Sequence, residues 1–445
     1  MSLDRAQTDV RTLSNVQDLL DTFRSAEKPR AAFQVGLEHE RFVYPAASSE
    51  PVPYAGPHGI GALLGALQPM GYQPFRETPD GPTIALTKQR LTVSLEPGGQ
   101  VELSGSPYRT AREVHAESLG NAADVRAAAA SLGLTGACFG YRPWGTAAQM
   151  PWMPKARYEA MRETLGARGR LARDMMQMTC TTQASFDWAD EADCARKVTL
   201  TARLAPLLVA LYANSPLVDG RNVGWQSYRS RVWNDVDPAR CGYFPALIDG
   251  TFSYQAYVDW ALDAPLLFLR RNGHYERPKA TFRELLAKGY DGHPALASDW
   301  TDHLSTLFPE VRIKSVLEVR SADAGSVATA GAMAALWRGL LYDARALEDA
   351  GKLVPQLSFA EHLAFHAEAQ RLGLHGMLGK TPISTLARDM VRVAREGLLR
   401  LDPLDAPLLE PLEEAAARAR SPADGLLAAF AKNPSPANLL QVAAL

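Results

Sequence analysis

The residues best suited to chemistry are charged side chains that recur at even spacing in three strand-like stretches. These stretches are AAFQVGLEHERFVY (31–44), QRLTVSLEPGGQVELSGSP (89–107) and VRIKSVLEVRS (311–321), and apolar residues alternate with polar ones in each. Successive side chains of a strand point to opposite faces, so residues two apart share a face. The charged residues that fall on such faces are Glu38, Glu40, Glu96, Glu102, Glu318 and Arg320.

The middle stretch has the pattern of a β-hairpin. Pro97–Gly99 supplies a tight turn, because glycine adopts positive φ at little cost. With a three-residue loop, Glu96 faces Gln100, and Glu102 lies two residues further along the same face. For a hairpin on its own, a solvated outer face is the simpler interpretation. The recurrence of the pattern in two distant stretches favours a shared site instead.

Side by side in one sheet, the three stretches would bring five glutamates together. Packed carboxylates repel one another unless a cation lies among them. Ligand sets made only of oxygen favour hard cations, so Mg²⁺ or Mn²⁺ is preferred over zinc. The pattern therefore predicts a nucleotide–metal site for phosphoryl transfer, with arginines that stabilise the transferred charge.

Two further stretches add polar side chains that are suited to the same site. The first, Asp174–Trp188, predicts a strand whose polar face looks over a cavity. The second, Gly224–Trp233, carries two arginines at a spacing of two residues. These arginines share an extended face, form a basic arm that reaches an anion, or lie on the surface. The residues concerned are Thr179, Thr181, Gln183 and Ser185 in the first stretch and Arg229 and Arg231 in the second.

Several other chemistries are excluded because their motifs are missing. The sequence has no GxxxxGK[ST] P-loop, no GxSxG nucleophile elbow and no HExxH zinc motif. His39 points to the face of its strand opposite its two acidic neighbours, which favours a core histidine over a ligand. Cys180 falls on the face opposite Thr179 and Thr181, which favours a buried thiol over a nucleophile.

The totals describe an ordinary globular chain of 445 residues, 47% hydrophobic and 22% charged, with a net charge of −2. That charge argues against a nucleic-acid partner, and no apolar run approaches the length of a membrane span. The four cysteines lack metal-binding spacing, and the N-terminal stretch lacks the apolar core of a signal peptide. We therefore expect a reduced, cytoplasmic protein.

The rest of the chain alternates helical patterns with strands and becomes helical throughout after the third charged stretch. Long helices are predicted at 109–132 and 191–212. Beyond residue 326, Ala/Leu/Arg-rich helical patterns occupy 328–348, 357–372, 382–399 and 408–430. We expect one catalytic domain over 1–445, with a sheet-based core at 30–325 and a mainly helical layer at 326–445.

Seven motifs together carry a resemblance to a known family. In order, they are GLEHERF, SLEPGGQVELSGSP, MPKARYEAMR, DMMQMTCTTQASFD, LYANSPLVDG, SYRSRVWNDVDPARCG and FPEVRIKSVLEVRSAD. Over roughly residues 30 to 350 the chain resembles glutamate–cysteine ligases of the plant and proteobacterial type. The resemblance implies an α+β, glutamine-synthetase-like fold, in which a curved, mainly antiparallel sheet forms a funnel with helices outside.

The resemblance also implies the reaction and its partners. ATP would drive the joining of the glutamate γ-carboxyl to the cysteine amine through γ-glutamyl phosphate, the first step of glutathione or ergothioneine-type thiol biosynthesis. A γ-glutamyl ligase that acts on a different amine is the alternative. The partners would be glutamate, cysteine and ATP, with neither nucleic acid nor membrane, and the chain would be a monomer or a homodimer.

Roles for individual residues follow from the same resemblance. The implied Mg²⁺ ligands are Glu38, Glu40, Glu96, Glu102 and Glu318. The implied nucleotide contacts are Gln100, Thr181, Gln183 and Ser185. Arg320 is placed to stabilise the transferring phosphoryl group, while Arg229 and Arg231 are candidates for the glutamate α-carboxylate or the phosphate. Ser185 and Met178 depart from the asparagine and arginine expected at these positions, which affects the acceptor rather than the phosphoryl chemistry.

Overall fold

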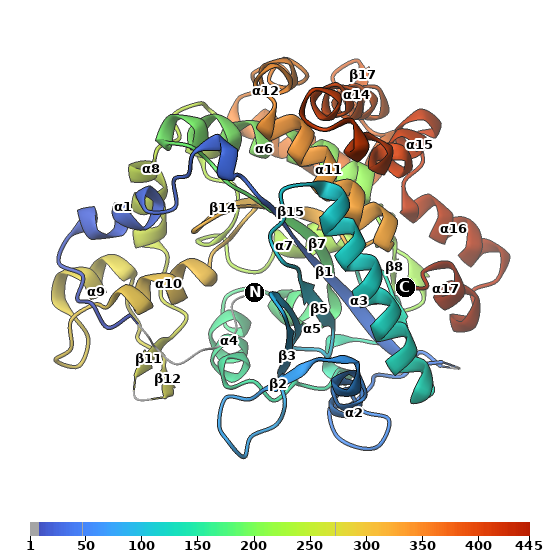
Figure 1. Cartoon of the computed structure of the whole chain (residues 1–445), viewed down its shortest axis with the longest axis horizontal. Coiled ribbons are helices and arrows are strands. Elements are labelled where there is room, and N and C mark those ends of the chain that lie inside the picture. Colours follow the sequence, from blue (N-terminus) through green and yellow to red (C-terminus); the bar gives the residue numbers. More distant parts are fainter. Residues whose placement is uncertain (1–8, 47, 272) are drawn as a thin grey trace.

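A curved antiparallel sheet of nine strands forms the centre of the computed structural model, which describes residues 9–46, 48–271 and 273–445 (Figure 1). The strand order is β14-β15-β7-β1-β5-β4-β3-β2, and β6 pairs with the far end of β1. This arrangement confirms the α+β fold class. The strands are β1 (Val35–Pro45), β2 (Gln73–Phe75), β3 (Ala85–Lys88), β4 (Leu91–Leu95), β5 (Val101–Ser104), β6 (Leu134–Ala137), β7 (Thr181–Phe186), β14 (Val311–Ile313) and β15 (Leu317–Asp323).

The register of the sheet brings the three charged stretches into neighbouring strands. Glu40 on β1 lies opposite Glu102 on β5, and Glu38 lies opposite Gln183 on β7. Strand β7 also pairs with β15, which carries Glu318. The alternation of polar and apolar residues therefore continues across four adjacent strands, and one face of the sheet collects the charged side chains.

Helices α3 (Ala111–Ser131), α6 (Glu191–Tyr212) and α11 (Val327–Tyr342) cover the other face. The apolar residues that alternate with the charged ones, such as Leu37 and Val319, are buried in one core with α6 and α11. Because α11 is buried on nearly all sides, its sequence is apolar all round rather than amphipathic.

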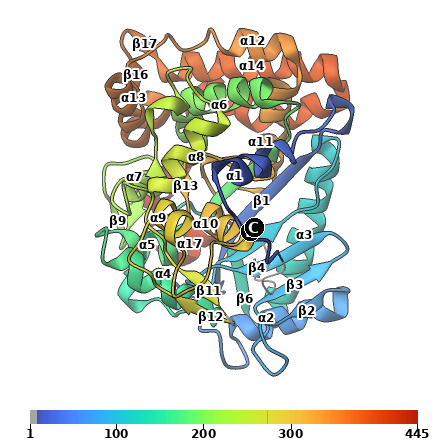
Figure 2. The same ribbon diagram turned by 90° about the vertical axis from the view of Figure 1, so that its left-hand side faces the viewer.

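A second layer lies above these helices and includes α12 (Ala344–Ala350), α13 (Phe359–Leu372) and α14 (Ile383–Leu401) (Figure 2). Helices α11 and α14 approach closely at Gly339, where an added Cβ would lie 2.2 Å from the carbonyl oxygen of Ala394. Glycine at this position is therefore a packing requirement.

The charged face of the sheet is covered by shorter elements. These are α4 (Ala156–Gly166), α5 (Ala172–Met178), α7 (Tyr228–Trp233) and α10 (Ala297–Ser305), together with the strand β13 (Phe308–Pro309). Each contributes side chains to a pocket against the sheet.

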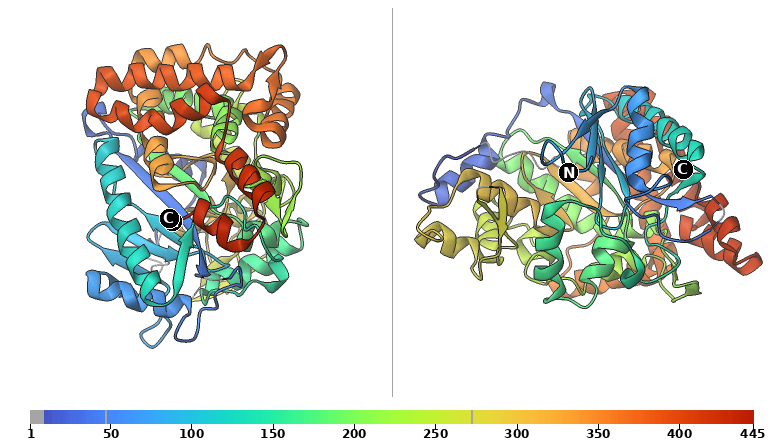
Figure 3. Two further views of the ribbon diagram at one scale, coloured as in Figure 1. Left: turned by 90° about the vertical axis from the view of Figure 1, so that its right-hand side faces the viewer. Right: turned by 90° about the horizontal axis from the view of Figure 1, so that it is seen from below.

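The remaining elements lie around this centre, and Figure 3 shows the last two helices, in red, beside the sheet. The remaining helices are α1 (Val16–Arg24), α2 (Ile60–Leu67), α8 (Tyr254–Asp263), α9 (Phe282–Lys288), α15 (Glu410–Arg418), α16 (Pro422–Lys432) and α17 (Pro436–Val442). The short strands are β8 (Leu217–Val218), β9 (Arg221–Asn222), β10 (Cys241–Gly242), β11 (Leu269–Arg271), β12 (His274–Glu276), β16 (Met377–Leu378) and β17 (Thr381–Pro382). Within the described ranges, no helix is long and apolar enough to cross a membrane.

Two local predictions from the sequence are wrong, and in a third stretch, 224–233, the structure excludes the extended face that was one of the alternatives. The stretch 174–188 is not one strand: α5 runs to Met178, and β7 begins only at Thr181. The stretch 224–233 ends in the helix α7, which begins at the cap residue Ser227. The helix predicted at 328–348 breaks where Asp343 caps the start of α12. In the last two cases a capping side chain sets the boundary, a local signal that periodicity alone does not report.

Candidate active site

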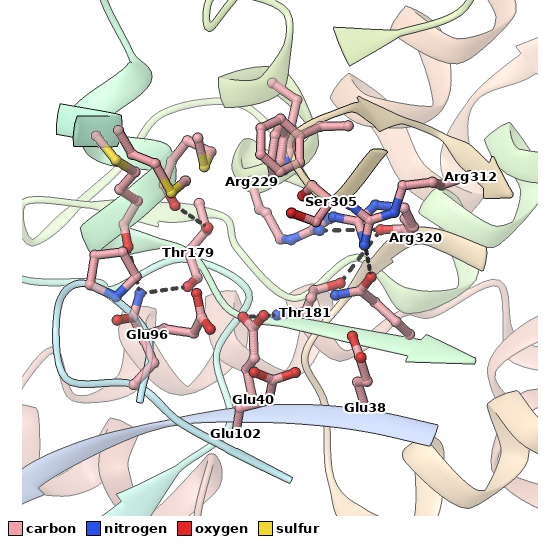
Figure 4. A pocket seen from close by; sticks show the side chains of 18 of the residues that line it. Glu38, Glu40, Glu96, Glu102, Thr179, Thr181, Arg229, Ser305, Arg312 and Arg320 are labelled. Atoms are coloured by element: carbon pink, nitrogen blue, oxygen red, sulfur yellow. Dashed lines mark hydrogen bonds between the residues drawn. The ribbon is translucent and has the colours of Figure 1, made fainter. Parts of the chain in front are cut away.

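The pocket on the charged face is divided into two halves of opposite charge (Figure 4). The carboxylates of the acidic half lie along β1 and the β4–β5 hairpin, and the cations of the basic half come from α7, β14, the β14–β15 loop and β15. We define the acidic half as Glu38, Glu40, Glu96 and Glu102, and the basic half as Arg229, Arg312, Lys314 and Arg320.

The acidic half contains four of the five predicted metal ligands. The hairpin register is the predicted one, with the backbone N–H of Glu96 donating to the carbonyl of Gln100 at 2.9 Å. Glu40 Oε2 accepts a hydrogen bond from the backbone N–H of Thr181 at 2.9 Å. Strands that are distant in sequence thus converge on one set of carboxylates.

Two of these carboxylates, Glu40 and Glu96, are poorly compensated. Burial, followed by the charges of Glu102 and Glu40, raises the pKa of Glu96 well above its usual value even with Lys155 nearby. Glu96 Oε1 is also buried without a hydrogen-bond partner. Burial and the charge of Glu102 raise the pKa of Glu40 to about 8. Uncompensated buried oxygens of this kind fit a hard cation.

Binding of a cation by the acidic half requires further ligands. In the described part of the chain, no three acidic, histidine or cysteine side chains are close enough together to enclose an ion. Mg²⁺ in nucleotide enzymes is typically held by one or two carboxylates together with phosphate oxygens and water. The acidic half therefore suits an ion that arrives with a phosphorylated ligand.

Glu318, the fifth predicted ligand, does not line the pocket. Its carboxylate pairs with Arg312 Nε at 2.5 Å, Lys314 Nζ at 2.7 Å and Arg320 at 3.4 Å. Burial alone would raise the pKa of Glu318, but these three cations lower it below the ordinary value. In this structure Glu318 holds the basic half together rather than joining the acidic one.

The two arginines of α7 are separated by the helical geometry. Residues two apart on a helix point in different directions, whereas on a strand they share a face. Arg229 lines the pocket, and Arg231 does not; its guanidinium lies over the ring of Trp225 at 5.9 Å. The resemblance makes both arginines candidates for the site, and of the two the structure brings only Arg229 into the pocket.

The predicted nucleotide contacts differ in their placement. Gln100 holds the hairpin to the α5–β7 connection by donating to the carbonyls of Met176 and Thr179 at 3.2 and 2.9 Å. Gln183 accepts a hydrogen bond from Arg320, and both line the pocket. Ser185 shares the face of Gln183 on β7 but is not among the pocket residues, because it lies nearer the end of the strand.

Several residues that line the pocket were not predicted from the sequence. Arg312 and Lys314 precede Glu318 at even spacing on β14 and its loop, and this spacing was the available signal. Arg157 lies within a quoted motif, MPKARYEAMR, that received no role. The apolar wall had no comparable signal, because methionines and aromatic residues are more often core than site. This wall consists of Tyr158, Met161, Met175, Met176, Trp233 and Phe308.

Two other sequence predictions concern residues beneath the site. His39 is fully buried, and its Nε2 lies 2.8 Å from the carbonyl oxygen of Gly325. Burial lowers the pKa of His39 to about 3, as expected of a neutral core histidine. Cys180 is also buried, and burial raises its pKa well above that of a free thiol. Both placements agree with a structural role.

Solved structures share the fold of this chain. The chain matches a glutamate–cysteine ligase from Francisella tularensis, solved in complex with AMP, with a TM-score of 0.57 and 12% identity over 92% of this chain and 87% of that one. A bifunctional glutathione synthetase from Pasteurella multocida matches with a TM-score of 0.50 and 14% identity over 97% of this chain and 53% of that one. These likenesses show that the chain shares its fold with both proteins.

Sequence comparison identifies the family to which the chain belongs. The model of glutamate–cysteine ligase family 2 matches residues 34–437. The chloroplastic glutamate–cysteine ligase of Brassica juncea is 34% identical over 92% of this chain and 80% of its own length. The enzyme of Arabidopsis thaliana is also 34% identical, over 92% of this chain and 79% of its own length. The chain belongs to the glutamate–cysteine ligase family, as the motifs predicted.

One prediction is overturned by these relatives. A cytoplasmic location was inferred from composition, the cysteines and the N-terminal stretch, but the relatives from Brassica juncea, Medicago truncatula, Arabidopsis thaliana and Nicotiana tabacum are named as chloroplastic. The prediction of a cytoplasmic location is therefore wrong. Free cysteines are compatible with every reducing compartment, so they do not distinguish the cytoplasm from a plastid.

Proposed function

We propose that this protein joins the γ-carboxyl of glutamate to the amine of cysteine at the expense of ATP, the first step of glutathione synthesis. The observation that carries the proposal is the family match over residues 34–437, which includes the strands that supply both halves of the pocket. The glutamate γ-carboxylate attacks the terminal phosphorus of ATP and ADP leaves. The cysteine amine then attacks the γ-glutamyl phosphate, and inorganic phosphate leaves.

The basic half binds the anionic parts of the substrates. Arg320 lines the pocket beside Gln183, and we assign it to the transferring phosphoryl group, since guanidinium matches phosphate in a bidentate manner. Arg229 donates to the carbonyl of Arg320 and its charge acts on Glu40, and we assign it to the glutamate α-carboxylate. Arg312 and Lys314 add positive charge and are fixed by Glu318.

The acidic half would hold Mg²⁺ or, alternatively, Mn²⁺ through one or two of its carboxylates together with phosphate oxygens of ATP, and the candidate ligands are Glu38, Glu40, Glu96 and Glu102. Such an ion supplies neutralisation of the triphosphate charge. Support for this assignment is the unpartnered buried oxygen of Glu96 and the raised pKa values of Glu40 and Glu96.

We further propose that the sheet core and the helical layer act as one catalytic unit, as a monomer or a homodimer. Helix α13 of the layer contacts α7 of the core directly: Gln370 Nε2 donates to the carbonyl of Ser230 at 3.0 Å. Light scattering coupled to size-exclusion chromatography distinguishes the two oligomeric states.

The test of the proposed function is ADP release by the purified protein with MgATP. Glutamate alone should give slow release, with 5-oxoproline formed by cyclisation of the acyl phosphate. Adding cysteine should accelerate release and yield γ-glutamylcysteine, and serine and other amines should be poorer acceptors. If no acceptor leads to ADP release, the proposal is overturned. If another amine accelerates ADP release more than cysteine does, that amine is the substrate in place of cysteine.

A further inference from the structure

The helix that carries Arg229 is too short to hold its own position. Helix α7 has six residues, Tyr228–Trp233, and a helix of this length is unstable without tertiary contacts. Its first turn nevertheless fixes the backbone of Arg229, whose side chain is 97% buried and reaches the pocket. The contacts that hold this turn therefore determine where the guanidinium lies.

A buried carboxylate lies beside this turn. Asp323 is the last residue of β15 and is 1% exposed. Its Oδ2 accepts hydrogen bonds from the backbone N–H of Asn214 at 2.8 Å and from the hydroxyl of Ser215 at 2.6 Å. Its Oδ1 accepts from the hydroxyl of Ser227 at 2.8 Å. Gly140 leaves the space that the carboxylate occupies, since a Cβ there would lie 2.4 Å from Asp323 Cγ.

The two serines connect Asp323 to the first turn of α7. Ser215 Oγ accepts the backbone N–H of Arg229 at 3.0 Å, and Ser227 Oγ accepts that of Ser230 at 3.2 Å. Each hydroxyl donates to Asp323 and accepts from the helix. A single carboxylate therefore orients both capping groups of the first turn, and in each the hydrogen-bonding direction is fixed.

The guanidinium of Arg229 meets the same strand. It donates to the carbonyls of Arg320 at 3.2 Å and Ser321 at 3.5 Å, on the segment of β15 that ends at Asp323. From the opposite side, Gln370 accepts the backbone N–H of Ser227 on its own carbonyl at 3.0 Å. Strand β15 therefore holds Arg229 in two ways. Asp323 fixes its backbone through Ser215, and the carbonyls of the strand accept hydrogen bonds from its guanidinium.

We propose that Asp323 is a positioning residue for the ligase reaction, which sets the Arg229 guanidinium in the pocket by fixing the first turn of α7 through Ser215 and Ser227. The inference rests on the proposed function, in which Arg229 binds a substrate carboxylate. Asp323 itself is not a pocket residue, and its effect on catalysis passes through Arg229.

A double-mutant cycle between Asp323→Asn and Arg229→Gln tests the proposal. Asparagine keeps the shape but offers one acceptor oxygen in place of two, so at least one of the three donors loses its partner. We expect Asp323→Asn to raise KM for glutamate and to lower kcat/KM on the order of 10-fold, because small misplacements of a binding group are costly. In the Arg229→Gln background the same change should have little further effect.

A matched control separates positioning from general stability. Asp405 is also a buried carboxylate that caps the start of a helix. It accepts hydrogen bonds from the backbone N–H groups of Ala111 and Arg112, the first two residues of α3, at 2.9 and 3.1 Å. Asp405→Asn should lower the free energy of unfolding while leaving KM for glutamate unchanged. Its effects should combine additively with those of Arg229→Gln.

Should Asp323→Asn not fold, Ser227→Ala removes one of the two relays and enters the same cycle. Non-additive effects with Arg229→Gln support the proposal. If the wild type is active and the effects of the two substitutions are additive, the proposal about Asp323 is overturned and the proposed function stands. A wild type that releases no ADP with any amine overturns the proposed function and this inference together.

Discussion

Glu96 of the acidic half and Glu318, which pairs with the basic half, have pKa values that their surroundings shift in opposite directions. Glu96 lies among other carboxylates, its pKa is raised, and one of its oxygens has no partner. Glu318 is more deeply buried, but three cations surround it and its pKa is lowered. The Glu318 carboxylate is thus paired within the protein, whereas Glu96 carries a buried oxygen that no group of the described protein compensates.

This difference predicts opposite effects on stability for the same substitution. Residues selected for function often destabilise the fold, and their replacement is then neutral or favourable. Removing one partner of a buried ion pair leaves the other charge unpaired and is costly. The following predictions use this contrast, beginning with the largest effect.

Glu318→Gln should lower the free energy of unfolding by about 3–5 kcal/mol, because Arg312, Lys314 and Arg320 would then repel one another in a buried site. Urea denaturation measures the change. As a control, Glu396→Gln removes an exposed helical pair with Arg392 and should have no measurable effect. Wild-type stability of Glu318→Gln would mean that these cations do not depend on the carboxylate.

Glu96→Gln should lower turnover on the order of 10²-fold at saturating MgATP, because a lost ligand misplaces the ion and the phosphoryl group that it orients. Its stability should equal or exceed that of the wild type, since carboxylate repulsion is relieved. Glu113→Gln, an exposed capping change on α3, is the control and should leave turnover unaltered. Full activity of Glu96→Gln would remove it from the metal site.

Arg320→Lys keeps the positive charge but loses the planar, bidentate geometry. We expect kcat to fall on the order of 10-fold with a smaller rise in KM for ATP, because the contact is strongest in the transition state. Steady-state kinetics over a range of ATP concentrations separate the two constants. A change restricted to KM would show that Arg320 only anchors the nucleotide.

Mg²⁺ together with ADP should stabilise the wild type more than ADP with a chelator does, by about 1–2 kcal/mol at roughly ten times the dissociation constant. The additional stabilisation should be absent in Glu96→Gln and retained in Glu113→Gln. Thermal denaturation with each ligand mixture measures the difference. An equal shift in Glu96→Gln would separate metal binding from that carboxylate.

The contrast also shows what the sequence revealed and what it did not. Strand alternation and a short turn were enough to place Glu38, Glu40, Glu96 and Glu102 together, because both signals are local and the register follows from burying one face. The same alternation placed Glu318 on the correct strand. It could not show that this side chain pairs with cations, because the partner Arg312 lies opposite it across a hairpin with a bend at Lys314–Val316.

Other errors have a similar origin. Arg231 was misplaced because α7 is helical by virtue of its Ser227 cap and its contacts with β15, rather than by its own periodicity. The methionines of α5 were read as part of a strand because a helix of seven residues is too short to show a clear period. Features set by tertiary contact were therefore missed, and those set by local pattern were found.

The most direct test of the division between the two halves is a crystal structure with Mn²⁺ and a non-hydrolysable ATP analogue, recorded at a wavelength where manganese scatters anomalously. We predict anomalous peaks beside carboxylates of the acidic half, with Glu318 still paired to Arg312. A peak coordinated by Glu318, with its cations turned away, would contradict the account and restore the five-glutamate site that the sequence suggested.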